Sequence, residues 1–180
     1  MTVLALDPTT GGVDTGASME FAPRPRTLHG QVLGIVANGL GISEVMFDRI
    51  ADLLCERDGL AGVVKIVKPS VAVPAWPEQW EEIISQATVA VTGLGGCGSC
   101  STRSMRDALD LEMLGIPAVC IVHTALVPAV KALATLVGAT DYPMVLIDYP
   151  YNPTAMWEKE EATALADSIV DGVRACLTRA

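Results

Sequence analysis

Two cysteines separated by two residues are the part of this sequence best suited to chemistry. Cys97 and Cys100 follow an apolar run and a glycine-rich turn, and they open a stretch with the apolar spacing of a helix. A helix N-terminus presents unpaired N–H groups and a partial positive charge, which together lower the pKa of a nearby thiol. One thiolate can therefore attack an electrophile, and the other can then attack the adduct or mixed disulfide and release the product.

The residues around the two thiols are candidate substrate-binding residues. Glycine lets the backbone approach a ligand closely because it has no side chain. We predict this role for Gly95, Gly96, Gly98 and Ser99.

Two other functions use similar motifs, and the sequence favours neither. Cysteines at this spacing are common zinc ligands, but only His123 is an obvious third ligand and no second close pair follows. Residues 93–98 also match the Gly-x-Gly-x-x-Gly pattern of dinucleotide-binding proteins. The next strand, however, ends at His123 and Thr124, without the acidic residue that such proteins carry there. We expect no metal and no other cofactor.

Polar residues at two other strand ends are further candidates. Histidine as a residue type titrates near working pH, so His123 could act as a general acid or base or orient a substrate carboxylate. The alternative is a histidine that only forms a hydrogen bond at the end of its strand. We predict a catalytic role for His123, beside Cys97 and Cys100, and substrate binding by Asn38 and Thr124.

Three cations could also serve the site. Arg103 and Arg106, early in the predicted helix, could bind an anionic substrate group or favour a thiolate, or could simply pair with Asp107 or Asp110 across a helical turn. Arg103 is nearer to the thiols, and we predict that it binds substrate. Lys68 could add another cation, although a lysine before a proline is more often an exposed loop residue.

The remaining chain predicts the elements that position these residues. From residue 31 onward, short β-branched apolar runs alternate with helical patterns, which is typical of a parallel sheet covered on both faces. We predict a single flavodoxin-like three-layer α/β domain over residues 29–180, with a five-stranded parallel sheet. The predicted strands are residues 31–37, 61–67, 87–92, 117–122 and 143–147, and the predicted helices are residues 42–57, 77–86, 99–114, 127–137 and 155–177.

Ligands of an open parallel sheet bind beyond the carboxyl ends of its strands, where loops and helix N-termini meet. The five predicted strand ends all carry polar residues, so one pocket could hold them. These positions are residues 38–39, 68–69, 95–100, 123–124 and 148–152.

The amino-acid composition limits the kinds of binding partner that we expect. The 180-residue chain has a formal charge of −9 and no Lys/Arg-rich run, so we expect neither a nucleic acid nor a membrane as partner. No apolar stretch approaches the roughly 20 residues of a membrane span, no secretion signal is visible, and the cysteine count of five is odd. We therefore expect a cytoplasmic protein with reduced thiols, in which Cys55, Cys120 and Cys176 are buried and structural.

Two segments lack periodicity. Residues 1–28 are rich in proline and glycine and predict an extended N-terminal arm, which commonly packs on a partner subunit; we expect a homo- or hetero-oligomer. Residues 68–80 predict a long loop with three prolines and two tryptophans. His29, Trp76 and Trp80 are expected to be structural or interfacial.

Several motifs together resemble the UGSC family, which is named for a selenocysteine-Gly-Ser-Cys motif in which many members carry cysteine in place of selenocysteine. The resemblance covers nearly the whole chain. It rests on Leu6-Asp7-Pro8-Thr9, Gly34-Ile35-Val36-Ala37-Asn38, Gly96-Cys97-Gly98-Ser99-Cys100, Leu111-Glu112, Gly115-Ile116-Pro117, His123-Thr124 and Tyr149-Pro150.

Residues 97–124 are also similar to the selenoprotein subunit of glycine, sarcosine and betaine reductases, in which a selenol attacks carbon and displaces an amine. The resemblance implies that Cys97 is the nucleophile and that Cys100 resolves the adduct. Those reductases carry another cysteine where this chain has Arg103.

We therefore expect an enzyme in which the Cys97 thiolate attacks an electrophilic small molecule, with reductase-like cleavage of a C–N or C–S bond, or thiol transfer. A thiol reductant would then restore the cysteines. The alternatives are a thiol–disulfide oxidoreductase that acts on a protein partner, and a subunit that supplies a site to a hetero-oligomer.

Overall fold

The structure is a computed structural model that describes residues 18–148, 156 and 158–179. Strands and helices alternate along the chain. The strands are β1 (Val32–Ala37), β2 (Gly62–Val67), β3 (Val89–Gly93), β4 (Ala118–His123) and β5 (Met144–Ile147). The helices are α1 (Ser43–Asp58), α2 (Pro77–Gln86), α3 (Gly98–Met113), the short 3₁₀ turn η1 (Thr124–Leu126), α4 (Val127–Leu136) and α5 (Lys159–Leu177).

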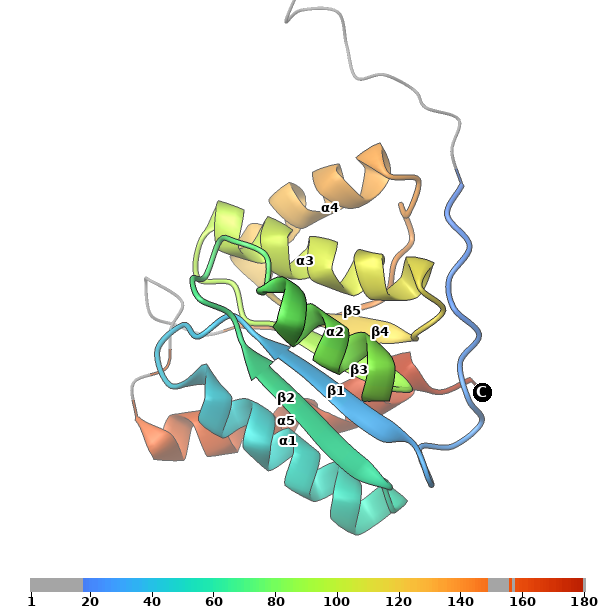
Figure 1. The fold of residues 1–180 in the computed structure, drawn as a ribbon. Coiled ribbons are helices and arrows are strands. Elements are labelled where there is room, and N and C mark those ends of the chain that lie inside the picture. Colours follow the sequence, from blue (N-terminus) through green and yellow to red (C-terminus); the bar gives the residue numbers. More distant parts are fainter. Residues whose placement is uncertain (1–17, 149–155, 157, 180) are drawn as a thin grey trace, which may run out of the picture.

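The five strands form one parallel sheet in the order β2-β1-β3-β4-β5. Helices α1 and α5 cover one face of the sheet and α2, α3 and α4 cover the other, so the molecule has three layers (Figure 1). This strand order is that of the flavodoxin-like fold, which confirms the predicted fold class. The strand order reverses between β1 and β3, and in this fold class ligands bind outside the carboxyl ends of those two strands.

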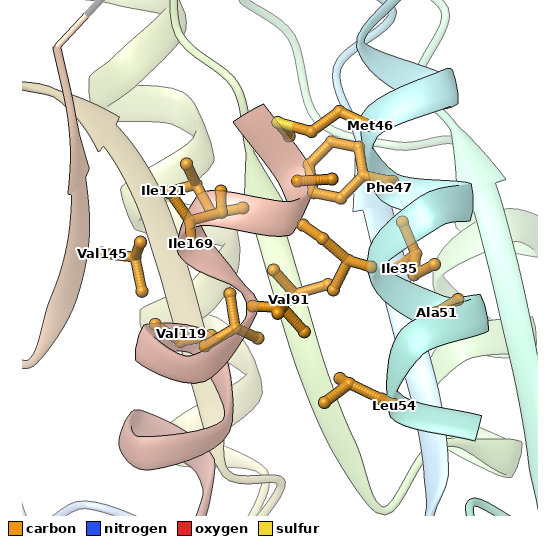
Figure 2. Packing of buried hydrophobic residues seen from close by; sticks show 14 of the residues in the cluster. Ile35, Met46, Phe47, Ala51, Leu54, Val91, Val119, Ile121, Val145 and Ile169 are labelled. Atoms are coloured by element: carbon orange, nitrogen blue, oxygen red, sulfur yellow. The ribbon is translucent and has the colours of Figure 1, made fainter. Parts of the chain in front are cut away.

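Burial of apolar side chains on both faces holds the layers together, because removing such surface from water drives folding. The strands are short apolar runs, and β3 and β4 are buried along their whole length. On one face, Phe47 and Leu54 of α1 and Ile169 of α5 pack against β1, β3 and β4 (Figure 2). Gly59 caps the C-terminus of helix α1 just after Asp58, with a φ of 68° in the left-handed region that glycine adopts readily.

The described part of the N-terminal arm runs along its own chain. Residues 18–28 contain no helix or strand, and Leu28 is fully buried in the core. The arm makes backbone hydrogen bonds from Met19 to Gly138 and from Arg179 to Pro25. This segment therefore contacts its own domain, and its packing on a partner subunit stays a prediction.

The predicted loop 68–80 is shorter in the structure, because α2 begins at Pro77. Proline suits the first position of a helix, where its missing N–H would have no intrahelical partner. At the other end of the chain, α5 begins at Lys159, later than the predicted residue 155. Among the described residues, no helix combines the length and apolar character needed to cross a membrane.

Candidate functional site

The turn between β3 and α3 depends on two glycines. Gly93 has a φ of 143°, and a Cβ there would lie 3.0 Å from the carbonyl oxygen of Ile121. A Cβ on Gly95 would lie 2.5 Å from the Cα of Ser101, closer than real Cβ atoms approach. The missing side chain at Gly95 therefore lets the turn pack directly under the first turn of α3, and the missing side chain at Gly93 lets it lie against β4.

Cys97 is the N-cap residue of α3, and its sulfur accepts a hydrogen bond from the backbone N–H of Cys100 at 3.3 Å. The Ser99 hydroxyl oxygen lies 3.3 Å from the same sulfur. Cys97 is exposed, whereas Cys100 is 4% exposed. The two cysteines form a disulfide, with Cα atoms 5.2 Å apart. The pair thus has one accessible sulfur, with a buried sulfur in bonding contact with it.

Asn38 links the loop after β1 to the loop after β3 through hydrogen bonds. Its backbone N–H donates to Gly93, its side-chain amide donates to the carbonyl oxygen of Leu94, and its side-chain oxygen accepts from Leu40 at 3.1 Å. Asn38 is 1% exposed. The structure therefore brings Asn38 next to the turn that leads to Cys97, at the point where the strand order reverses, and engages both ends of its amide with backbone.

His123 is the last residue of β4, the neighbour of β3, as the sequence predicted. Its Nδ1 accepts the backbone N–H of Ala125 at 3.0 Å, so the neutral ring carries its proton on Nε2. His123 is 6% exposed. The Thr124 hydroxyl donates to Asp148 at 3.2 Å on the exposed surface beside it. His123 and Thr124 thus both lie at the end of β4. The catalytic role of His123 and the substrate-binding role of Thr124 remain predictions.

Lys68 corrects an expectation, because the structure buries it. Its side chain is fully buried, and its Nζ lies 2.7 Å from Oδ2 of Asp107. A lysine is buried in this way only when a partner compensates for its desolvation. Lys68 therefore pairs with a carboxylate of α3 inside the protein and is not a cation at the mouth of the thiol site.

Arg103 and Arg106 form the pairs that the sequence offered as the alternative to substrate binding. Arg103 donates to Asp107 Oδ1 at 2.6 Å and to Asp110 Oδ2 at 3.1 Å, while Arg106 donates to Asp110 Oδ1 at 2.7 Å. Arg103 also lines a cavity of about 200 Å³ between α3 and the segment 74–80. Cys97 does not line that cavity. The cavity that Arg103 lines therefore does not include Cys97, and substrate binding by Arg103 at the thiol site stays a prediction.

Glu112 belongs to the family motif Leu111-Glu112, but the sequence did not predict its contacts. Its fully buried carboxylate accepts hydrogen bonds from both terminal nitrogens of Arg24, at 2.6 and 2.8 Å. It also accepts the backbone N–H groups of Ala22 and Ala118. Burial, with the negative charge of Glu112, raises the pKa of the neighbouring Tyr142 well above its usual range. The carboxylate thus holds the N-terminal arm against α3 and β4.

The three remaining cysteines differ in exposure. Cys120 is buried, and burial raises the pKa of its thiol to about 12. Cys176 is half-buried, and burial raises its pKa as well. Cys55 is exposed, against expectation, because one further residue along α1 turns it about 100° away from the buried Leu54. Cys120 alone of the three fits the predicted buried thiol fully.

No group of three or more His, Cys, Asp or Glu residues within the described ranges is arranged to hold a metal ion. Two motifs from the sequence fall elsewhere. The segment 149–152, expected at the fifth strand end, and the motif at residues 6–9 lie outside the described residues.

The fold and the site together define a flavodoxin-like α/β protein with a Cys-Gly-Ser-Cys pair at the start of α3. The sequence model of the UGSC family matches residues 4–179, so the chain belongs to the UGSC family. No curated protein gives a significant match. Among solved structures, a flavodoxin of Streptococcus pneumonia TIGR4 is 16% identical, with 79% of this chain and 96% of that chain covered and a TM-score of 0.43. A likeness at that level says nothing about what this chain binds.

Proposed function

We propose that this protein is a cysteine-dependent enzyme in which the Cys97 thiolate attacks an electrophilic small molecule and Cys100 resolves the adduct. The carrying observation is the contrast between the exposed Cys97 at the N-cap of α3 and the buried Cys100 in contact with it. The helix N-terminus and the Cys100 N–H both favour negative charge on the Cys97 sulfur.

The reaction has two steps that balance. In the first step, the Cys97 sulfur forms a bond to an activated carbon, and the leaving group departs with its electron pair. In the second, the Cys100 thiolate attacks the Cys97 sulfur, the S–C bond breaks, and the carbon takes the electron pair and a proton. The substrate is thereby reduced by two electrons, and the two cysteines become a disulfide that a thiol reductant must reopen.

An α-halo ketone is a suitable substrate for testing these two steps, because its carbonyl stabilises the carbanion that leaves in the second step. The reduced wild-type protein should release the dehalogenated ketone and gain the Cys97–Cys100 disulfide. Cys100→Ser should stop at a thioether on Cys97, visible by intact mass, and Cys97→Ser should do neither. Equal modification of Cys97→Ser and wild type would overturn the proposal, and Cys55→Ser controls for the exposed thiol on α1.

Thiol–disulfide exchange with a protein partner is the second candidate, and the disulfide between Cys97 and Cys100 favours it. A redox titration separates the two functions. A defined two-electron midpoint together with no thioether in Cys100→Ser would support exchange, whereas a stable thioether on Cys97 supports attack on carbon.

A third candidate is a subunit that completes a site with another chain. Trp76, in the segment before α2, is 59% exposed and could contact such a chain. Full activity of the isolated chain on the α-halo ketone would argue against this role.

A further inference from the structure

A cavity beside α3 stands apart from the thiol site. Its volume is about 200 Å³, and no cysteine lines it. Arg103, on its wall, lies six residues beyond Cys97, which is about 9 Å along the axis of an α-helix. The volume is below the roughly 300–1,000 Å³ of sites for drug-sized ligands, so its occupant would be one small molecule.

One wall of the cavity is apolar. Pro74, Ala75 and Pro77 contribute to it together with the ring of Trp80, which is half-buried. Prolines at these positions restrict the backbone, so the wall is formed before any ligand arrives. The wall suits a flat apolar body, which would stack on the indole ring.

The opposite wall is formed by the ion pairs of α3. Their acceptor oxygens already have hydrogen bonds, whereas one donor group does not. Both oxygens of Asp107 and both oxygens of Asp110 already accept a hydrogen bond from a lysine or arginine. The Nη1 of Arg103 has no partner among the described residues, although its Nε and Nη2 are engaged. A guanidinium carries five N–H donors, so the unused capacity at this wall is for donating.

The charges at this wall also favour a ligand that accepts hydrogen bonds. Lys68, Arg103 and Arg106 face the two carboxylates of Asp107 and Asp110, so the cluster carries a net positive charge within an acidic chain. Lys68 is fully buried and neutralises one side of Asp107, which leaves Arg103 less fully compensated. A ligand with acceptor oxygens and a negative charge therefore complements this wall better than a cation does.

We propose that this cavity is a binding site for a small organic acid, with its carboxylate on Arg103 and its flat apolar part against Trp80. The site is separate from the proposed thiol chemistry. Binding should therefore be the same in the reduced protein, the oxidised protein and Cys97→Ser.

Calorimetric titration of the full chain with three matched probes tests the proposal. Phenylacetate should bind more tightly than phenylacetamide, and phenethylamine should bind most weakly. Equal binding of the acid and the amide, tighter binding of the amine, or no binding of phenylacetate at millimolar concentration would each overturn it.

Variants locate the binding. Arg103→Gln and Trp80→Leu should each weaken phenylacetate binding by about tenfold, the order expected for losing a charge-assisted hydrogen bond or an aromatic contact. Arg103→Lys, which keeps the charge and the fold, should lie between Arg103→Gln and wild type. Lys131→Gln, at an exposed cation on α4, and Trp76→Leu are matched controls outside the cavity and should bind as the wild type does. A loss of binding in the controls equal to that in Arg103→Gln would place the ligand elsewhere and refute the site.

Discussion

The backbone N–H of Cys100 lies 3.3 Å from the sulfur of Cys97, so the first cysteine of the motif caps the helix that carries the second. Sulfur here occupies the position that a serine or aspartate oxygen holds at many helix N-termini. When the pair is reduced, the same N–H and the helix dipole stabilise a thiolate on Cys97.

This cap predicts the order in which the thiols react. In the reduced protein at neutral pH, we expect iodoacetamide to label Cys97 first and the exposed Cys55 more slowly, with Cys120 unlabelled until the protein unfolds. Peptide mass spectrometry over time measures the order. Labelling of Cys55 ahead of Cys97 would contradict the activation of Cys97 by the helix.

The packing of the turn under α3 predicts that one of two alanine substitutions destabilises the protein and the other does not. Gly95→Ala places a Cβ against the backbone of Ser101, so it should cost about 1–3 kcal/mol of unfolding free energy and slow labelling of Cys97. Gly98→Ala meets open space and should leave stability nearly unchanged. Urea denaturation of the two variants makes the comparison, and equal stability would show that the turn tolerates a side chain at 95.

The buried pair of Lys68 and Asp107 should be costly to break on one side. Lys68→Met leaves the Asp107 carboxylate, which is 2% exposed, without its buried partner, so we expect a loss of about 3–5 kcal/mol. Replacing both residues, in Lys68→Met with Asp107→Leu, should recover most of that loss. Chemical denaturation of the single and double variants measures the coupling; additive effects would mean that the two side chains do not interact.

The buried carboxylate of Glu112 should control the N-terminal arm. Glu112→Gln removes the charge opposite Arg24, and we expect a loss of about 3 kcal/mol and faster proteolysis within residues 18–28. Glu56→Gln, at an exposed carboxylate on α1, is the control. Unchanged proteolysis in Glu112→Gln would show that other contacts hold the arm.

Stability should fall at alkaline pH because of Cys120. Its folded pKa is raised to about 12 from an ordinary 9.0, so above pH 9 the unfolded chain releases a proton that the folded protein keeps. The unfolding free energy should therefore fall as pH rises above 9, by up to about 1.4 kcal/mol per pH unit for this one group. Tyr142, whose pKa is also raised, acts in the same direction at higher pH.

The measurement is denaturation under reducing conditions between pH 8 and 10.5. Cys120→Ala should show a shallower decline than the wild type, and Cys55→Ala controls for removing a thiol at the surface. Identical slopes in Cys120→Ala and wild type would contradict the linkage.

Much of the fold could be predicted from the sequence, because alternating apolar runs and amphipathic stretches report local structure and burial together. All five strands and five helices lie where the periodicity placed them, within a few residues. The exposure of Cys55 was missed because adjacent helix positions differ by about 100°, and the pattern leaves the edge of the buried face undefined.

The candidate site was predictable where its parts are close in sequence. The positions of Cys97, Ser99 and Cys100 follow from a turn and the first turn of one helix. The ion pairs of Lys68 with Asp107 and of Glu112 with Arg24 could not be predicted, since they join residues that are 39 and 88 positions apart. No local pattern reports such distant contacts.

The sequence by itself determined the order of the elements, the buried strands and the cysteine pair at a strand-to-helix turn, because each depends on neighbouring residues. Tertiary structure alone decided which charges are buried, which arginine lines a cavity, and that the loops after β1 and β3 meet through Asn38. The physical reason is that burial and ion pairing depend on surfaces brought together by sheet pairing and helix packing. Those surfaces exist only once the chain has folded.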